Sequence, residues 1–516
     1  MRDLASEYIQ GAADVLDFYA APPRSILERT PSPTAWDPAL VSSLRAYQET
    51  LGATASFDGT EAVIITGQQP AMFTGPLYTI YKAITAIRLA RTVEQNSGVP
   101  CIPVFWVGGE DHDFEEARSA TFLTKAHRPF SFRYAPATDV TGLPMHRIPL
   151  EESLHKSIDA IAAELPGPDY RSEVLELLHA SLDASESLAD WSARLLARLF
   201  RDTPLVFFSP HLPAARALGA DLIRREIADP LATTRMINDA GNALERLDFQ
   251  PQLTKGETEC NFFVEVDSRR RKVVFEKGVF SLPEVDESYS ADELVALLES
   301  DPERFSPNVA LRCVTQQTLF PVAAYVAGPG EVAYWAQLKP LFERFDVPMP
   351  IVYPRAECAL TTIKLNKLLR KLGLKLDDLH RPMDDLLLTA MRSNAQNPAL
   401  VLAETERKAI EKALDELAEG LGTHDKTAAS MAVALAAEMG EKFDRLERTI
   451  IQGDEARMTT VRQQLDRLCN SLAPGRKPQE RVYSIFSFLF EYGWELVPRL
   501  LEEMDVESFR MNEIEL

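Results

Sequence analysis

The sequence has few cysteines and no long apolar run. Its 516 residues include five scattered cysteines without a CxxC pair, so we expect buried thiols and neither a disulfide framework nor a structural zinc site. No run of about 18 uncharged apolar residues occurs, so no transmembrane helix is predicted. The first residues mix acids with apolar side chains and lack the pattern of a signal peptide. We therefore expect a cytoplasmic protein that does not associate with membranes.

Positive charge is scarce as well. The chain has 55 Lys and Arg residues against 77 Asp and Glu residues, a formal net charge of -22. This balance argues against a broad basic surface, so no nucleic-acid partner is expected. The hydrophobic fraction of 46% and the charged fraction of 26% are ordinary for a globular protein, and the length allows several cores.

Short apolar runs alternate with amphipathic helices in much of the chain. A strand, a helix and a second strand at this spacing form a βαβ unit, and repeated units favour a doubly wound parallel α/β sheet. We assign residues 1–116, 201–230 and 311–382 to this core. The predicted strands are 62–66, 102–107, 205–209, 321–327 and 349–353, and the predicted helices are about 76–94, 212–227 and 331–345.

Two insertions interrupt the core. Residues 117–200 contain a possible strand pair, 131–134 with 146–150, and two helical stretches. Residues 231–310 contain a helix and a hairpin of strands 261–266 and 272–276. The hairpin's three consecutive arginines indicate a solvated turn, with phosphate or carboxylate binding as the alternative.

Residues 383–473 have a different pattern. Apolar residues recur there at steps of three and four between charged residues, and 423–425 reads as a turn, which predicts an antiparallel coiled coil. Both packing within one chain and a dimer seam remain open. Residues 474–516 include an apolar helix that we expect to dock on the core. The recurring residues are Ile410, Leu414, Leu417, Leu421, Phe443, Leu446, Ile450, Met458, Val461, Leu465, Leu468 and Leu472.

The first candidate site segment spans residues 66–82, directly after a predicted strand. Ligands of open α/β sheets bind beyond the carboxyl ends of the strands, and a glycine loop leading into a helix offers N–H groups to an anion. The alternative is an ordinary turn with polar residues facing water, because the segment matches neither GxxxxGK[ST] nor GxGxxG. The candidate ligand-binding residues are Gly67, Gln68, Gln69, Thr74, Gly75, Tyr78, Tyr81 and Lys82.

The second segment, residues 106–116, also follows a predicted strand. It contains Trp106 and the run Glu110, Asp111, His112 and Asp113. Carboxylates around a histidine can act as a general base, a cation site or a substrate clamp, whereas the plain alternative is an acidic helix start. With only one histidine at hand, no metal site is predicted.

The third segment, residues 328–338, is again a glycine turn between a strand and a helix. Its candidate residues are Gly328, Gly330, Glu331, Tyr334 and Trp335, and the alternative is a tight turn with core aromatics. Single residues elsewhere are weaker candidates for ligand binding. Arginines near strand ends are suited to bind carboxylates or phosphates, and the alternative is that they form surface ion pairs. These weaker signals are Lys255, Asn261, Arg312, Gln316 and Arg355.

Four segments carry a resemblance to a known family. Residues 64–90, 103–116, 311–345 and 474–493 are similar to the cysteine-adding enzymes of bacillithiol biosynthesis. The resemblance covers nearly the whole chain. Cys313 stands where the family more often has proline, and Gln317 replaces a frequent acid, which affects only local detail near Arg312.

The resemblance implies a Rossmann-like parallel sheet core with connecting-peptide insertions and a C-terminal α-helical coiled coil that forms a homodimer. It implies that L-cysteine is added to the amino group of glucosaminyl-malate, as an amide, in the last step of bacillithiol biosynthesis. It also implies ATP or ADP with Mg²⁺, without a tightly bound cofactor. Because condensing a free carboxylate with an amine in water is uphill, cysteine needs activation, yet no HIGH or KMSKS signature is present.

We expect Asp111 and His112, with Asp113 and Glu110 beside them, to handle protons. Lys82 and Arg355 are expected to bind substrate anions, and the remaining residues of the three segments and Arg312 are expected to contact substrate. Two other readings stay open. One is a nucleotide- or sugar-binding scaffold without catalysis, and the other is an amino-acid-activating nucleotidyltransferase of other specificity.

Overall fold

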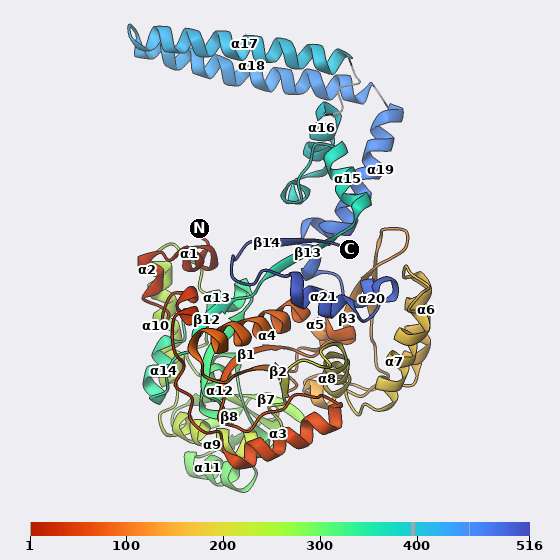
Figure 1. The fold of residues 1–516 in the computed structure, drawn as a ribbon. Coiled ribbons are helices and arrows are strands. Elements are labelled where there is room, and N and C mark those ends of the chain that lie inside the picture. Colours follow the sequence, from red (N-terminus) through yellow and green to blue (C-terminus); the bar gives the residue numbers. More distant parts are fainter. Residues whose placement is uncertain (1, 394–397, 454) are drawn as a thin grey trace. The chain divides into compact units, whose positions relative to one another are not determined.

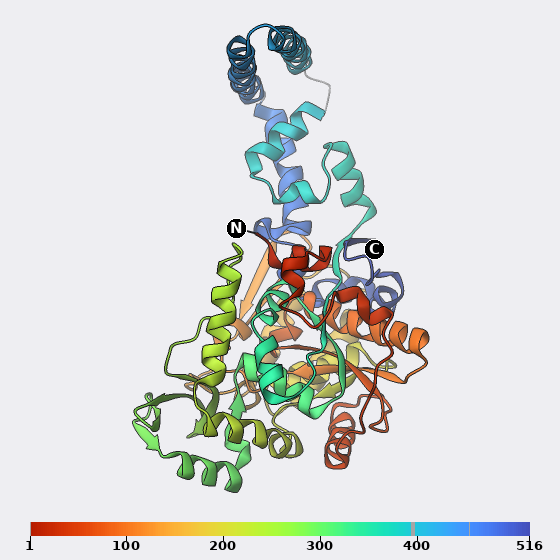
Figure 2. The ribbon, with the colours of Figure 1, turned by 90° about the vertical axis from the view of Figure 1, so that its left-hand side faces the viewer.

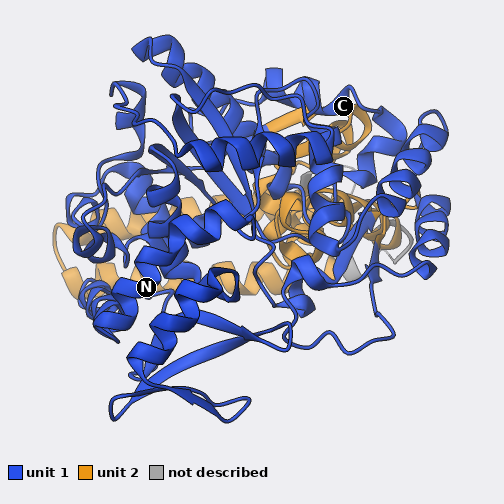
Figure 3. Ribbon diagram, turned by 90° about the horizontal axis from the view of Figure 1, so that it is seen from below, with its two compact units in different colours: residues 1–122, 130–358, 483–512 blue, residues 123–129, 359–482, 513–516 orange. Residues whose placement is uncertain are grey.

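The computed structural model describes residues 2–393, 398–453 and 455–516 (Figure 1). The chain forms two compact units, which Figure 3 shows in different colours. Unit 1 comprises residues 1–122, 130–358 and 483–512, and unit 2 comprises residues 123–129, 359–482 and 513–516. The last apolar segment of the chain therefore belongs mainly to unit 1.

Unit 1 is built on a five-stranded parallel sheet with the order β12-β11-β1-β2-β5, which confirms the predicted α/β class. The order reverses at β1, because β2 and β5 lie on one side of it and β11 and β12 on the other. The carboxyl ends of β1 and β11 thus form the switch point, where open sheets bind ligands. The strands are β1 (Ala62–Gln68), β2 (Cys101–Val107), β5 (Val206–Phe208), β11 (Val322–Ala327) and β12 (Ile351–Pro354).

Helix α4 (Tyr78–Ser97) connects β1 to β2 and is buried over most of its length. It ends at Gly98, whose φ of 71° is the left-handed conformation that a helix terminator requires. The other helices of unit 1 are α1 (Leu4–Gln10), α2 (Ala13–Leu16), α3 (Pro38–Leu51), α5 (Phe114–Ala117), α6 (Ser153–Glu164), α7 (Arg171–Asp183), α8 (Leu188–Leu199), α9 (Pro213–Ala228), α10 (Ala232–Glu245), α11 (Ala291–Ser300), α12 (Val309–Leu319), α13 (Pro329–Trp335), α14 (Lys339–Phe345), α20 (Phe486–Tyr492) and α21 (Leu496–Glu503).

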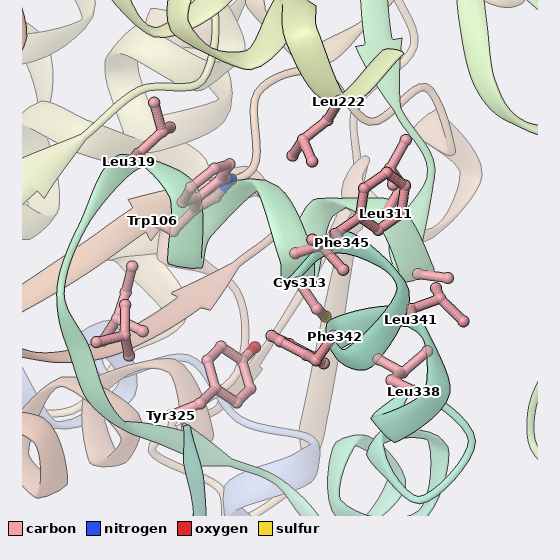
Figure 4. Packing of buried hydrophobic residues seen from close by; sticks show 14 of the residues in the cluster. Trp106, Leu222, Leu311, Cys313, Leu319, Tyr325, Leu338, Leu341, Phe342 and Phe345 are labelled. Atoms are coloured by element: carbon pink, nitrogen blue, oxygen red, sulfur yellow. The ribbon is translucent and has the colours of Figure 1, made fainter. Parts of the chain in front are cut away.

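One core cluster packs α12, α13 and α14 against the sheet (Figure 4). Trp106 of β2 and Tyr325 of β11 contribute large rings to it, and Cys313 lies completely buried among them. Burial raises the pKa of the Cys313 thiol to about 11, so this thiol is a packing group rather than a nucleophile. Four of the five cysteines are buried and Cys469 is half-buried, as the sequence indicated.

The predicted helix over 331–345 is wrong in one respect. The structure has two shorter helices, α13 and α14, instead of one. Pro340 lies in the first turn of α14, where its missing N–H is tolerated, whereas in the middle of a single helix it would break the hydrogen bonding.

The strand pair predicted in the first insertion is also wrong. Strand β4 (Pro129–Arg133) belongs to a two-stranded sheet with β3 (Ser119–Leu123), and residues Met145–Arg147 form a 3₁₀ turn. The N–H groups of this turn are used elsewhere, since His146 donates its N–H to the carbonyl of Gly109 at 2.9 Å.

The second insertion forms an antiparallel sheet of order β10-β6-β7-β8-β9, seen with α11 in Figure 2. Its tight turn is Asp267–Ser268, with φ of 50° and 61°, so the three arginines lie within a strand and the solvated-turn prediction is wrong. Because strand side chains alternate between faces, Arg270 is turned inward and only 8% exposed. The strands are β6 (Glu259–Val266), β7 (Arg269–Glu276), β8 (Val279–Leu282), β9 (Glu287–Tyr289) and β10 (Phe305–Pro307).

Unit 2 is mainly helical. Helices α17 and α18 form the long hairpin that the sequence predicted, joined at residues 423–425. Leu417 and Leu446 are 49% and 48% exposed, so they do not lie inside this hairpin. The unit contains α15 (Ile363–Lys371), α16 (Met383–Ser393), α17 (Pro398–Gly422), α18 (Lys426–Gln452) and α19 (Glu455–Leu472), and residues of β13 (Glu357–Thr361) and β14 (Met511–Glu515). None of the helices within the described residues combines the length and apolar character needed to cross a bilayer.

Candidate active site

A buried ion pair occupies the switch point of the parallel sheet. The Lys82 Nζ atom lies 2.5 Å from Glu331 Oε2 and donates to the carbonyl of Gly67 at 2.9 Å and to Gln68 Oε1 at 3.0 Å. The Lys82 side chain is only 5% exposed. The first and third segments predicted from the sequence are therefore joined directly through Lys82 and Glu331.

Glu331 is held in place from three sides. Besides pairing with Lys82, it accepts hydrogen bonds from the backbone N–H of Gly328 at 2.7 Å and from the Tyr325 hydroxyl at 2.5 Å. Burial acts to raise the pKa of Glu331, but the Lys82 charge and these donors outweigh it and leave the pKa below its ordinary value. The carboxylate is thus ionised at neutral pH.

Arg312 brings a second cation to this cluster. Its guanidinium donates to the hydroxyls of Tyr334 and Tyr325, at 3.2 and 3.4 Å, and lies 5.8 Å from the centre of the Trp106 ring. No Asp or Glu oxygen of the described residues lies within 4.0 Å of it. Arg312 is therefore partnered only by neutral groups.

Arg355, which follows β12, is the third cation, and its guanidinium lies 5.8 Å from the ring centre of Tyr78. The charges of Arg355 and Arg312 both act on Lys82, which places the three cations near one another. Glu331 is the carboxylate that pairs with Lys82. Three cations gathered at a ligand-binding edge of a sheet are suited to carboxylates or phosphates.

The loop between β1 and α4 has an unusual backbone. Phe73 and Thr74 have φ of 52° and 63°, values that are rare for residues with a side chain and costly for a β-branched one. The Phe73 ring is fixed by edge-on contacts with Phe122 and Trp191 at 5.1 and 5.2 Å, and its carbonyl accepts a hydrogen bond from Ser484. Such strain, fixed by surrounding packing, is typical of functional loops.

This loop is also tied to the second predicted segment. Gln69 donates its amide to the carbonyl of Asp113 at 3.0 Å, and Gly108 donates its N–H to the carbonyl of Gln68 at 3.0 Å. A Cβ atom on Gly67 would lie 2.8 Å from Trp106 Cβ, so only glycine fits between the two strand ends. The structure thus brings all three segments together at one edge of the sheet.

The acidic run after β2 has a structural use. The Asp113 carboxylate accepts from the N–H of Glu116 and caps α5, and the Asp111 carboxylate accepts from the N–H of His112 at 2.7 Å. The acidic helix-start alternative therefore describes Asp113. Asp111 and His112 remain half exposed, so their role in catalysis stays a prediction.

His112 is positioned by Arg270 of β7. The Arg270 Nη1 atom lies 3.4 Å from His112 Nδ1, and because a guanidinium only donates, Nδ1 is the acceptor and the ring proton lies on Nε2. Burial and the charge of Arg270 lower the pKa of His112, so the ring is neutral at pH 7. It can donate a hydrogen bond through Nε2 to an oxygen.

Arg216, which was not predicted from the sequence, forms a buried ion pair with Glu110. Glu110 Oε2 is 3.2 Å from Arg216 Nη1, both side chains are less than 9% exposed, and Arg216 also donates to the carbonyl of Phe305. Beside them is a cavity of ≈ 20 Å³, lined by both side chains and Trp106, which has room for one water molecule.

Two stacked histidines were missed as well. The rings of His146 and His211 lie 4.5 Å apart, with Nδ1 of His146 3.0 Å from the carbonyl of Gly109 and Nδ1 of His211 2.7 Å from Ser209 Oγ. Ser209 is the last residue of the predicted strand 205–209, so the end of that strand was a signal that could have found His211.

His211 makes a pH-dependent contribution to stability. Burial, with the charges of His146 and Arg216, lowers the pKa of His211 from 6.5 to about 3. Above pH 6.5 the ring is neutral in the folded and unfolded chains. As pH falls from 6.5 toward 3, the unfolded chain takes up a proton that the folded chain does not. The free energy of unfolding therefore decreases by about 2 kcal/mol by pH 5.

We expect His211→Gln to lose less stability than the unsubstituted protein between pH 7 and pH 5. Urea unfolding followed by tryptophan fluorescence measures this loss for unit 1, because all five tryptophans lie in it. Equal losses in the two proteins would contradict the prediction.

Several other residues predicted for the site lie in the core or in the second insertion. Trp106 and Trp335 are at most 2% exposed and lie in the core beneath the cluster, and Tyr81 and Thr74 are also buried. Among the weaker signals, Lys255 pairs with Glu259, and Asn261 lies inside the second insertion. Those two residues are placed for structural roles.

Comparisons with known proteins agree with the fold. The model of the family "Bacillithiol biosynthesis BshC, N-terminal Rossmann-like domain" matches residues 2–356, and that of its C-terminal coiled-coil domain matches residues 359–516. Relatives named "Putative cysteine ligase BshC" are 32% identical in Salinibacter ruber, over 89% of this chain and 82% of the relative, and 30% identical in Heliobacterium modesticaldum, over 97% and 95%.

A solved structure described as "putative arginyl t-RNA synthetase" from Campylobacter jejuni covers 89% of this chain and 97% of its own. Its TM-score of 0.22 and identity of 11% are too low to carry an argument. The family models together match nearly every residue, in the order Rossmann-like domain and then coiled coil. This chain belongs to the bacillithiol biosynthesis BshC family.

Proposed function

We propose that the protein is a cysteine ligase that joins L-cysteine to the amino group of glucosaminyl-malate through an amide bond, the last step of bacillithiol biosynthesis. Membership of the family and the names of its relatives support this proposal. The structural observation that supports it most is the gathering of Lys82, Arg312 and Arg355 at the switch point. Both substrates carry carboxylates, and an activated cysteine carries an anionic leaving group.

Arg312 and Arg355 are the proposed anion-binding groups. A guanidinium matches a carboxylate or phosphate through two parallel hydrogen bonds, and Arg312 is paired with tyrosine hydroxyls rather than with an acid. Lys82 forms a buried ion pair with Glu331. We therefore expect it to hold the cluster in shape and not to contact the substrate directly.

Asp111 and His112 are the proposed proton-handling groups. The amine of glucosaminyl-malate must lose its proton before it attacks the acyl carbon of cysteine, and Asp111 is a half-exposed carboxylate that can accept it. Neutral His112, with its proton on Nε2, can donate a hydrogen bond to the acyl oxygen as negative charge develops there.

ATP is the proposed source of activation. Its phosphates would bind at the Gly67–Gly75 loop and the nearby cations, and Mg²⁺ would arrive with them, since it is commonly held by phosphates and one or two carboxylates. The described residues contain no group of three or more His, Cys, Asp and Glu side chains arranged for a metal ion.

A mass-spectrometric assay of the pure protein with cysteine, glucosaminyl-malate, ATP and Mg²⁺ tests the proposal. The expected result is an amide product of the calculated mass, lost when protein or ATP is omitted. Gln69→Ala and Asp111→Asn should reduce product formation at least about 100-fold with folding intact. Asp415→Asn, exposed on α17, is the matched control and should keep full activity. If Gln69→Ala and Asp111→Asn both retain full activity, the proposed site is wrong.

The same assay separates the alternatives. Exchange of pyrophosphate into ATP that depends on another amino acid would favour an amino-acid-activating nucleotidyltransferase. Tight ligand binding without turnover would favour the binding scaffold.

We also propose a homodimer formed through the coiled coil. Apolar side chains remain outside the seam between α17 and α18, and a second copy of the hairpin would cover them. A dimer mass in light scattering is expected, and a monomer at micromolar concentration would reject this assembly. These exposed residues include Leu402, Leu417, Met431, Leu435 and Leu446.

A further inference from the structure

Helices α6 and α7 lie side by side (Figure 1). They carry a symmetric cluster of two histidines and two aspartates that the proposed reaction does not use. His155 and Asp159 are four residues apart on α6, and His179 and Asp183 are four apart on α7, so each helix presents one pair on one face. The centres of the two imidazole rings lie 4.9 Å apart, with 17° between the ring planes. Because the Nδ1 atoms are only 2.7 Å apart, the rings meet edge to edge through these atoms.

The aspartates bind the outer nitrogens of the rings. His155 Nε2 lies 2.9 Å from Asp183 Oδ1, and His179 Nε2 lies 2.9 Å from Asp159 Oδ1, so each carboxylate crosses to the opposite helix. The inner nitrogens, Nδ1 of each ring, lie only 2.7 Å apart.

The two facing Nδ1 atoms require a positive charge between them. A carboxylate accepts hydrogen bonds, so each Nε2 carries a proton, and a neutral imidazole then has its lone pair on Nδ1. Two lone pairs would face each other at 2.7 Å, which is repulsive unless a positive charge lies between them. That charge is either one shared proton or a metal ion.

We propose that His155 and His179 bind a divalent transition-metal ion, of the Zn²⁺ or Cu²⁺ class, through their Nδ1 atoms. Metal-binding histidines usually donate their second N–H to a carboxylate, and Asp159 and Asp183 are placed to accept in this way. Imidazole nitrogen is a preferred ligand of both ions. The aspartates are positioning residues here, since they orient the rings and do not touch the ion.

The scaffold allows the ion to enter with little movement. Two nitrogens bound at about 2.0–2.1 Å to a tetrahedral ion lie roughly 3.3 Å apart, so the Nδ1 atoms need to separate by about 0.6 Å and the rings to turn until both lone pairs point at the ion. The histidine side chains are 29% and 28% exposed, which leaves room for this shift and for water ligands. Below them the helices are fixed by a packed apolar face that includes Leu154, Ile158, Val174 and Leu178.

The site is open rather than closed. The described residues offer no cluster of three or more protein ligands, and the two nitrogens leave the other coordination positions to water. An open site of this kind exchanges its ion readily, unlike a structural four-ligand zinc site. Binding would link α6 to α7 and add stability to the first insertion.

Titration of the tag-free, chelator-treated full-length protein with Zn²⁺ tests the proposal. Calorimetry should detect one ion per chain at this site, with release of at most one proton, because the two Nδ1 atoms share no more than one. His155→Gln and His179→Gln should each weaken binding at least tenfold. With Cu²⁺, paramagnetic resonance should show coupling to two imidazole nitrogens, and to one fewer in each variant.

Two matched variants act as controls. His424→Gln, in the exposed turn after α17, and His211→Gln, in the pair with His146, should bind the ion as the unsubstituted protein does. Should a histidine variant fail to fold, Asp183→Asn keeps both imidazoles and should weaken the affinity about 10- to 100-fold. Equal binding by His155→Gln and the unsubstituted protein would overturn the proposal, and so would the absence of any bound ion, which leaves the shared proton.

Discussion

Replacing Glu331 by glutamine is expected to destabilise unit 1 by about 3–5 kcal/mol, the cost of leaving a buried charge without its partner. Lys82 is 4% exposed and its ammonium has only Glu331 as an anionic partner in the described cluster. Glutamine keeps the size and hydrogen-bonding groups of the side chain, so the change isolates the charge. The variant is also expected to lose activity, because Lys82 and the loop of Gly67 would shift.

Urea unfolding followed by tryptophan fluorescence measures this effect. The double variant Lys82→Met with Glu331→Gln removes both charges and is expected to recover more than half of the lost stability, since an uncharged pair has no desolvation cost. Glu503→Gln is the matched control. Glu503 pairs with Arg499 on the surface of α21, and its loss should cost no more than about 0.5 kcal/mol. A Glu331→Gln protein as stable as the control would show that the pair is not buried.

The parallel sheet was predictable because its strands are buried on both faces. A short run such as Ala62–Thr66, apolar at successive positions and ended by glycine, has few other interpretations. The regular alternation of such runs with helices then fixes the fold class. The ends of the helices were less predictable, because they depend on single residues such as Pro340. The effect of a proline on a helix follows from its position within the turn.

The arginines at 269–271 show what local pattern cannot decide. Their meaning depends on whether the hairpin turns at Asp267 or two residues later, and a shift of one residue moves a strand side chain to the opposite face. The two-residue turn places Arg270 inward, against His112, rather than in solvent. A charge run that reads as solvated thereby becomes part of the candidate site.

The residues of the candidate site that follow strands were predicted from the sequence, whereas those that the insertions contribute were not. Gly67, Asp111 and Glu331 follow strands directly, so the rule for open sheets finds them. His146 and Arg270 come from insertions, and their distance to the sheet depends on how whole segments pack. Local sequence carries no signal for that packing.

Arg312→Met is expected to reduce kcat/KM for the ligase reaction about 100-fold, mainly through KM, because the guanidinium is proposed to bind a substrate anion before reaction. The same change is expected to leave the stability of unit 1 unaltered or slightly higher. The charge of Arg312 repels that of Lys82, and removing it relieves this repulsion. Arg312 and Glu331 should therefore affect stability in opposite directions.

Steady-state kinetics and urea unfolding on the same preparations check both halves of this expectation. Arg312→Lys should recover little activity, because a lysine cannot span the hydroxyls of Tyr325 and Tyr334 while presenting two parallel donors. Arg499→Met, which removes a surface arginine, is the control and should change neither quantity. If Arg312→Met destabilises unit 1 as strongly as Glu331→Gln, Arg312 holds the fold together. Its lack of a carboxylate partner would then no longer argue for a substrate anion.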